Sequence, residues 1–187
     1  MAEMTCCAVL LMDLQHDFLG AEGSRLPVQS DDAAAVIGAA NAILSKQALA
    51  HAIPVLVVNQ FPVTDRLANL FRNGAAVAGT PGANLDARIQ STGQAKVIIK
   101  ASSSAFTNPE LDRYLQAGKI TDLYVMGVFA EGCVRATVFD ARRRGYSVHV
   151  IADAIASSAS WKKRFALWAM KRVGVNITSS VFAFTAS

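Results

Sequence analysis

The sequence lacks long hydrophobic runs, because no apolar stretch approaches the roughly 18 residues that cross a bilayer. The first apolar run, residues 6–12, follows Glu3 with no Lys or Arg before it, whereas a secretory signal needs a basic start. Charged residues are also scarce, at 17% against 52% hydrophobic residues, a balance that excludes intrinsic disorder. With 187 residues, we expect a single cytoplasmic domain over 1–187 with no membrane partner.

Cysteine and histidine are too few for a disulfide framework or an evident metal site. The cysteines are Cys6, Cys7 and Cys133, with no Cys-x-x-Cys pair among them. Cys6 and Cys7 point to opposite faces of a predicted strand and therefore cannot readily pair with each other. We interpret both as small buried hydrophobic residues. The histidines are His16, His51 and His149. They lie in three separate predicted elements, so the sequence predicts no metal and no cofactor.

Apolar runs of strand length recur along the chain, and helical patterns separate them. The predicted strands are 6–12, 54–58, 96–99, 122–128, 147–151 and 175–178, and the predicted helices are 31–50, 109–117, 132–144 and 161–173. Continuous apolar runs are typical of strands buried on both faces. Their alternation with helices predicts an α/β sandwich, in which the long loops 14–29 and 59–83 are available to form a site.

Three reactive side chains follow predicted strands. Asp13, Lys100 and Cys133 come after the first, third and fourth strands, and ligands bind beyond the carboxyl ends of parallel strands. Cys133 falls at the start of helix 132–144, where free backbone N–H groups favour a thiolate, and Asp13 is available to take its proton. Each residue also has a structural alternative. Cys133 can be a core cysteine, Asp13 can cap backbone N–H groups, and Lys100 can be a solvated surface lysine.

Three segments resemble the motifs of the isochorismatase-like cysteine hydrolase superfamily, in the order that the superfamily has them. They are LLMDLQHDF at 10–18, VIIK at 97–100 with SAF at 104–106, and GVFAEGCVRAT at 127–137. The match covers essentially the whole chain. The resemblance implies a three-layer, Rossmann-like α/β/α sandwich with a six-stranded, mostly parallel sheet, and a homo-oligomer.

The resemblance also implies a mechanism based on a catalytic triad of Asp13, Lys100 and Cys133. Asp13 accepts the thiol proton and later delivers it to the leaving amine, and Lys100 supports the charges. Cys133 attacks a carbonyl carbon and forms a thioester that water hydrolyses. A cis peptide joining Val128 to Phe129 turns the backbone N–H groups of Phe129 and Cys133 toward the oxyanion. The expected substrate is a small amide or carbamoyl compound, cleaved at a C–N bond.

Departures from the superfamily pattern narrow this expectation. Residues 59–65 contain no histidine where nicotinamidases carry an Asp-x-His metal motif, and Cys133 is present where isochorismatases proper lack it. The chain therefore resembles the small isochorismatase-domain hydrolases more than nicotinamidases. The expected substrate pocket consists of Phe18, Gln60, Phe61, Phe106 and Ala130. Such a pocket suits a flat or apolar acyl group, although core packing is an equal alternative for these aromatic rings.

Basic residues gather in the last third of the chain. The groups 142–144, 162–164 and 171–172 hold three, three and two of the 18 Lys and Arg residues. No Gly-rich phosphate loop or aromatic nucleic-acid motif accompanies them, which disfavours nucleic-acid binding. Trp161, Phe165 and Trp168 share a helical face, for which core packing is the first interpretation and a subunit interface the second. A catalytically silent oligomeric binding protein is the remaining alternative.

Overall fold

The computed structural model describes residues 7–20, 22–45, 52–90, 93 and 95–179. Its strands form one parallel sheet in the order β3-β2-β1-β4-β5-β6. The strands are β1 (Cys7–Met12), β2 (Ala52–Asn59), β3 (Lys96–Lys100), β4 (Asp122–Val128), β5 (Ser147–Ala156) and β6 (Asn176–Thr178). The helices are α1 (Ser30–Leu44), α2 (Arg66–Phe71), α3 (Pro109–Ala117), α4 (Arg135–Arg143) and α5 (Ser160–Arg172). In these described segments, no helix has the length and apolarity to cross a membrane.

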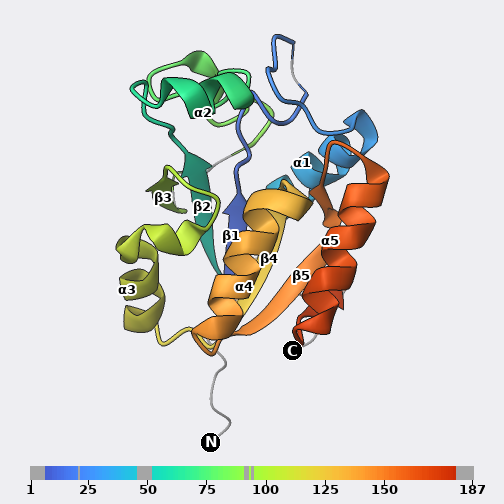
Figure 1. The fold of residues 1–187 in the computed structure, drawn as a ribbon. Coiled ribbons are helices and arrows are strands. Elements are labelled where there is room, and N and C mark those ends of the chain that lie inside the picture. The colour runs from blue at the N-terminus through green and yellow to red at the C-terminus, as the bar shows by residue number, and fades with distance from the viewer. Residues whose placement is uncertain (1–6, 21, 46–51, 91–92, 94, 180–187) are drawn as a thin grey trace, which may run out of the picture.

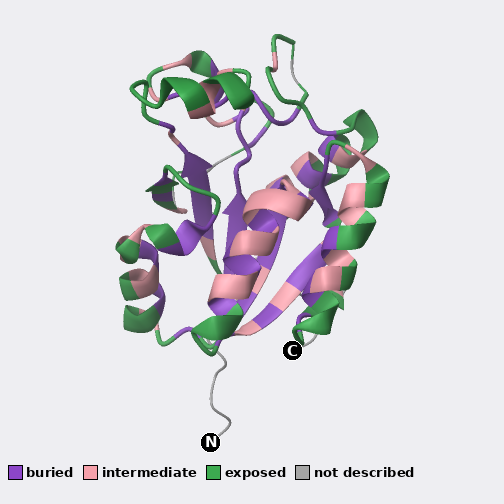
Figure 2. Cartoon of the chain, in the orientation of Figure 1, coloured by how far each residue is buried: buried purple, intermediate pink, exposed green. Residues whose placement is uncertain are grey.

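Helices cover both faces of the sheet and produce three layers (Figure 1). Leu10 and Met12 of β1 pack in one core with α3, α4 and α5, whereas Val9 and Leu11 pack in a second core with α1. Successive side chains of a strand point to opposite faces, so a strand between two cores must be apolar throughout. Buried residues accordingly concentrate in the sheet and on the inward helix faces (Figure 2). The predicted three-layer α/β/α sandwich with a six-stranded parallel sheet is confirmed.

Three strands are longer than the sequence predicts, and β3 gains only Lys100. β2 begins at Ala52, two residues early, because Ala52 pairs with Cys7 at the start of β1. β5 continues to Ala156, because its last residue pairs with Val128 at the end of β4. The charged Asp153 interrupts the apolar run of β5, so the sequence pattern stops too early.

The helices depart further from their predicted limits. The helix predicted over 31–50 ends at Leu44, and residues 46–50 lie outside the described residues, as do Cys6 and His51. The helix predicted over 132–144 begins with a π turn at 130–134 and continues as α4. The predicted loop 59–83 contains α2, which has no buried residue and therefore gives no amphipathic signal.

The aromatic face of α5 lies on the surface. The exposed fractions of Trp161, Phe165 and Trp168 are 63%, 50% and 55%. Ala166 and Met170 instead pack α5 against the sheet. The first interpretation of these aromatic residues, core packing, is wrong, because helical spacing identifies a shared face without showing which face meets the sheet.

The strand order reverses beside β1, which places a crevice at the carboxyl ends of the central strands. The chain runs from β1 through β2 to β3 on one side of the sheet, and from β4 through β5 to β6 on the other. Such a reversal is where open α/β sheets bind ligands. Asp13 directly follows β1, Lys100 ends β3, and the turn carrying Cys133 follows β4.

Gly127 allows β4 to lie close to β1 just before the Cys133 turn. Its φ is +110°, and a Cβ built there would lie 2.1 Å from the carbonyl oxygen of Met12. We expect Gly127→Ala to lower the free energy of unfolding by about 3 kcal/mol, from overlap and left-handed backbone together. Gly145→Ala is the matched control, since φ there is +89° with nothing within 4 Å of the built Cβ. Equal losses in urea denaturation would show that overlap with Met12 contributes nothing.

Candidate active site

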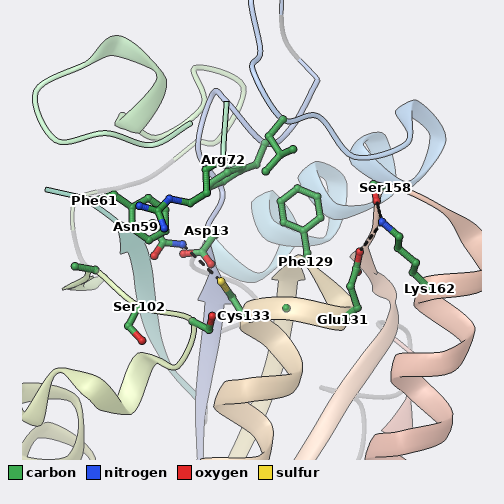
Figure 3. A pocket seen from close by; sticks show the side chains of 15 residues that line it. Asp13, Asn59, Phe61, Arg72, Ser102, Phe129, Glu131, Cys133, Ser158 and Lys162 are labelled. Carbon is green, nitrogen blue, oxygen red and sulfur yellow. Dashed lines mark hydrogen bonds and ion pairs between the residues drawn. The ribbon is translucent and has the colours of Figure 1, made fainter. Parts of the chain in front are cut away.

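A cavity of about 540 Å³ lies beyond the carboxyl ends of the central strands. Its walls come from the loop after β1, the end of β2, Phe61, Arg72 directly after α2, residues 101–103 after β3, the turn after β4 and the start of α5 (Figure 3). Small-molecule sites commonly measure roughly 300–1,000 Å³. The cavity therefore has the size and the position of a site for a small ligand.

Asp13, Lys100 and Cys133 meet at this cavity. The Lys100 Nζ donates to Asp13 Oδ2 at 3.0 Å and lies 3.4 Å from Cys133 Sγ. The same ammonium donates to the carbonyl oxygen of Ser102 at 3.1 Å, which fixes its direction. Three residues distant in sequence are thus within hydrogen-bonding range of one another, because parallel strands bring their carboxyl ends to one edge.

The carboxylate of Asp13 is fully enclosed in this arrangement. Asp13 adopts a left-handed φ of 55°, and its N–H donates to the carbonyl of Val57 at 2.8 Å. The side chains of Lys100 and Asp13 are 0% and 1% exposed. Burial raises the pKa of Asp13 above its ordinary value of 3.8, while the Lys100 charge and a hydrogen bond with Cys133 act in the opposite direction. Asp13 is therefore a stronger base than an exposed aspartate.

Cys133 lies in a tight turn between β4 and α4. The peptide bond between Val128 and Phe129 is cis, and the carbonyl of Phe129 accepts the N–H groups of Gly132 at 3.0 Å and Val134 at 3.2 Å. This turn presents Cys133 to the cavity, where the side chain is partly buried.

The resting sulfur is a neutral thiol. Burial, and then the Asp13 charge, raise the pKa of Cys133 from 9.0 to about 12, against the lowering effect of Lys100. The thiolate expected from the sequence is therefore wrong for the resting site. A helix start favours a thiolate, but desolvation and an adjacent carboxylate, both tertiary effects, outweigh it.

Asn59 is a third polar contact of the sulfur that the sequence did not single out. Its Nδ2 donates to Cys133 Sγ at 3.6 Å. The buried Gln15 holds the Asn59 backbone from both sides: Gln15 Oε1 accepts the Asn59 N–H at 2.7 Å, and Gln15 Nε2 donates to the Asn59 carbonyl at 2.7 Å. A sequence signal existed, since Asn59 is the last residue of a buried strand, as Lys100 is.

Three buried side-chain atoms in the described part of the chain have no hydrogen-bond partner, and all three belong to cavity residues. They are Asp13 Oδ1, Asn59 Oδ1 and Arg72 Nε. Buried polar groups in native proteins are nearly always paired, and an unpaired one is costly. Two acceptors and one donor at one cavity indicate a site whose ligand completes the hydrogen bonding.

Only some of the residues expected to form the substrate pocket line the cavity. Phe18 and Phe61 line the cavity, whereas Gln60, Phe106 and Ala130 do not. Asn59 and Phe61 are cavity residues on either side of Gln60, as the alternation of extended backbone requires. Phe106 packs instead against Tyr146, with ring centroids 5.9 Å apart, because a short turn at 105–107 directs it into the core. Ala130 is completely buried in the same core.

The cavity is more polar than the predicted phenylalanine pocket. Arg72, directly after α2, and Lys162 of α5 line it, and neither was expected there. Glu131 also lines it; its carboxylate accepts the Ser157 hydroxyl at 2.7 Å and lies 3.9 Å from Lys162 Nζ. These residues come from helices that meet only in the folded chain, so spacing along the sequence could not identify them.

Comparisons with known proteins agree with this architecture. Residues 7–181 match the family model described as Isochorismatase domain. A probable inactive nicotinamidase of Arabidopsis thaliana is 29% identical over 178 residues, which is 90% of this chain and 89% of that protein. An isochorismatase-like hydrolase from Alkaliphilus metalliredigens superposes with a TM-score of 0.83 at 22% identity, covering 94% and 96% of the two chains. The pyrazinamidase of Pyrococcus horikoshii, solved in complex with zinc, gives a TM-score of 0.80 at 28% identity, covering 92% and 98%.

Proposed function

Because the chain belongs to the isochorismatase family of hydrolases, we propose that it cleaves a C–N bond of a small amide or carbamoyl compound through Cys133. The observation that carries the proposal is the position of Lys100 Nζ, 3.0 Å from the Asp13 carboxylate and 3.4 Å from the sulfur. Base, cation and nucleophile then occupy one side of a cavity that admits a small molecule. This is the arrangement that nucleophilic catalysis requires.

In the first step, the thiol proton of Cys133 passes to Asp13 as the sulfur attacks the carbonyl carbon. A C–S bond forms, and the carbonyl electron pair moves onto the oxygen. The backbone N–H groups of Phe129 and Cys133 are the proposed donors to that oxyanion. The tetrahedral adduct then collapses: the C–N bond breaks, Asp13 gives its proton to the leaving nitrogen, and a thioester remains on Cys133.

In the second step, Asp13 removes a proton from water, which attacks the thioester carbon. The new C–O bond forms, the C–S bond breaks, and the proton on Asp13 returns to the sulfur. The product acid leaves, and the site regains its resting protonation. A raised pKa suits Asp13 to both transfers, because its protonated form can persist between them.

Asn59 and Lys100 support the charges that develop around the sulfur in this scheme. Asn59 Nδ2, at 3.6 Å, stabilises the sulfur as its proton departs. Asn59 Oδ1 and Asp13 Oδ1, which have no protein partner, are available to accept the N–H groups of the leaving amide. The charge of Lys100 lowers the pKa of Asp13 and so opposes the larger effect of its burial.

A zinc ion, which the pyrazinamidase binds, does not fit the residues present here. Among the described residues, no group of three His, Cys, Asp or Glu side chains is arranged to hold a metal. The cavity wall after β2 supplies the Asn59 amide and the Phe61 ring, and the Arg72 guanidinium lies 3.8 Å above that ring. A fixed positive charge beside such weak donors opposes cation binding, so no step is routed through a metal.

The alternative is a catalytically silent member of the family, and the probable inactive relative in Arabidopsis favours it. Assays of ammonia release from small amides, ureas and N-carbamoyl amino acids test between the two. No release from any of them would favour the silent alternative. We also propose a homo-oligomer, for which the exposed aromatic face of α5 is the supporting observation.

The pH dependence of hydrolysis tests the role of Asp13. Asp13 must be ionised to accept the thiol proton, and its pKa is raised by burial. We therefore expect kcat/KM to fall as the pH drops through a value above 3.8, the ordinary pKa of aspartate. We expect no rise near pH 9.0, since the pKa of the Cys133 thiol is about 12. Stopped assays across the pH range check both limbs, and a rise centred near 9.0 would contradict general-base attack.

A further inference from the structure

Arg72 is a fixed guanidinium with an unused donor at the cavity. Its Nη2 donates to Asn69 Oδ1 at 2.8 Å and to Asp65 Oδ2 at 3.3 Å, and its Cζ lies 3.8 Å above the Phe61 ring. Its side chain is only 26% exposed, and its Nε–H is buried without any acceptor. The side chain is thus held in place by protein contacts on one edge and left unsatisfied elsewhere.

Each of the charges at the cavity has an ion-pair partner, and the partner of Arg72 is the one most exposed to water. The carboxylate of Asp13 is neutralised by Lys100 at 3.0 Å, and that of Glu131 is balanced by Lys162 at 3.9 Å. Among the described residues, Arg72 forms an ion pair with Asp65 alone. The side chain of Asp65 is 48% exposed, so water screens this ion pair well. The positive charge of Arg72 at the cavity is therefore compensated only by this screened ion pair, at 3.3 Å.

We propose that the substrate carries a carboxylate, and that Arg72 is the residue that binds it. The inference rests on the proposed amide hydrolysis for the other end of the substrate. A carboxylate in the cavity accepts charge-assisted hydrogen bonds from the Arg72 guanidinium, which a planar guanidinium makes better than an ammonium. At the thiol end, the free oxygens of Asp13 and Asn59 accept amide N–H groups. The substrate class is therefore an amide or carbamoyl derivative of a small carboxylic acid.

Alkylation of Cys133 tests the carboxylate site without requiring turnover. Iodoacetate and iodoacetamide alkylate the sulfur through the same CH2 carbon. In both reactions a C–S bond forms, the C–I bond breaks, iodide leaves, and the thiol proton passes to Asp13 or water. They differ in whether a carboxylate is present. Because the same sulfur attacks the carbon of both reagents, its raised pKa cancels from the ratio of the two rates. Peptide mass spectrometry at about pH 9 follows Cys133 separately from Cys7.

We expect Arg72→Met to lower the iodoacetate-to-iodoacetamide rate ratio at Cys133 about tenfold, the effect of losing one charged hydrogen bond. Arg66→Met is the matched control, because it makes the same charge change in α2, the helix that Arg72 directly follows, and Arg66 does not line the cavity. Its ratio should stay within about twofold of the wild type. An unchanged ratio in Arg72→Met, or an equal fall in Arg66→Met, would overturn the proposal.

Asp65→Asn provides a change of the opposite sign with Arg72 in place. Removal of this carboxylate leaves the charge of Arg72 without its ion-pair partner. The iodoacetate-to-iodoacetamide rate ratio at Cys133 should therefore rise about twofold or more. This variant decides the question if Arg72→Met fails to fold, since no rise in a folded Asp65→Asn protein would contradict the proposal. Circular dichroism and unfolding curves check each variant.

Hydrolysis of matched amides separates this proposal from the activity itself. Succinamate and butyramide present the same primary amide with and without a carboxylate, and kcat/KM should favour succinamate in the wild type but not in Arg72→Met. Hydrolysis of both amides at equal rates, with an unchanged alkylation ratio, would remove the carboxylate site and leave amide hydrolysis standing. An alkylation ratio that Arg72→Met alters, without hydrolysis of either amide, would support the carboxylate site and contradict the proposed amide hydrolysis.

Discussion

Replacing Cys133 with alanine is expected to lower hydrolysis by a factor of about 10⁴ or more, because the thioester can no longer form. The fold should persist, since the side chain is only partly buried and makes no backbone hydrogen bond among those described. Ammonia release under saturating substrate measures the loss. Intact-mass spectrometry of the quenched wild type should show an acyl adduct that the variant lacks.

Cys7→Ala is the matched control for this variant. Cys7 is also a partly buried cysteine, but it lies at the amino end of β1, away from the cavity. Its replacement should leave the rate within about twofold of the wild type. Hydrolysis that survives in Cys133→Ala would eliminate covalent catalysis through this residue, and the silent alternative would then apply to any remaining role of the fold.

The second large effect is expected on stability. Lys100→Met should cost about 3–5 kcal/mol at neutral pH, because it leaves the Asp13 carboxylate buried without its cation. Lys96→Met is the control on the same strand: Lys96 pairs with Glu110, but the two side chains are 34% and 45% exposed. An ion pair so accessible to water is worth less than about 1 kcal/mol. Urea unfolding curves compare the two variants.

The penalty in Lys100→Met should depend on pH with a definite sign. Without Lys100, the influence that lowers the pKa of Asp13 is lost, and burial raises that pKa further. A folded-state pKa above the unfolded one stabilises the protein at low pH, and this stabilisation is lost as the pH rises through the folded value. The destabilisation relative to wild type should therefore be small near pH 3.8 and reach its full size above the raised pKa. A penalty independent of pH would show that packing, not the charge of Asp13, is responsible.

Local pattern was sufficient for most of the fold. Continuous apolar runs such as that of β1 predict strands between two cores, and the structure has those cores on either side of Leu10 and Leu11. The pattern failed where local and tertiary signals diverged. The charged Asp153 interrupts the apolar run of β5, so the sequence pattern did not predict where this strand ends. The helix α2 buries no residue and therefore has no hydrophobic periodicity to detect.

The candidate site was predictable only in part. Asp13, Lys100 and Cys133 follow strands, so their shared edge could be expected from the sequence. Arg72, directly after α2, and Lys162 of α5 carry no strand-end signal, and their common cavity depends on how α2 and α5 approach the sheet. The protonation of Cys133 was likewise misjudged, because its pKa depends on burial and on Asp13, 120 positions earlier in the chain.

The sequence by itself determined the alternation of strands and helices, the edge on which reactive groups gather, and the family to which the chain belongs. The alternation and the shared edge follow from periodicity and local order, which hold wherever a strand is enclosed by two layers, whereas the family follows from three motifs in order. Only the tertiary structure decided which groups face one another, which of them lose water, and hence which carry protons. Desolvation and contact depend on segments far apart in the chain, and no local pattern specifies them.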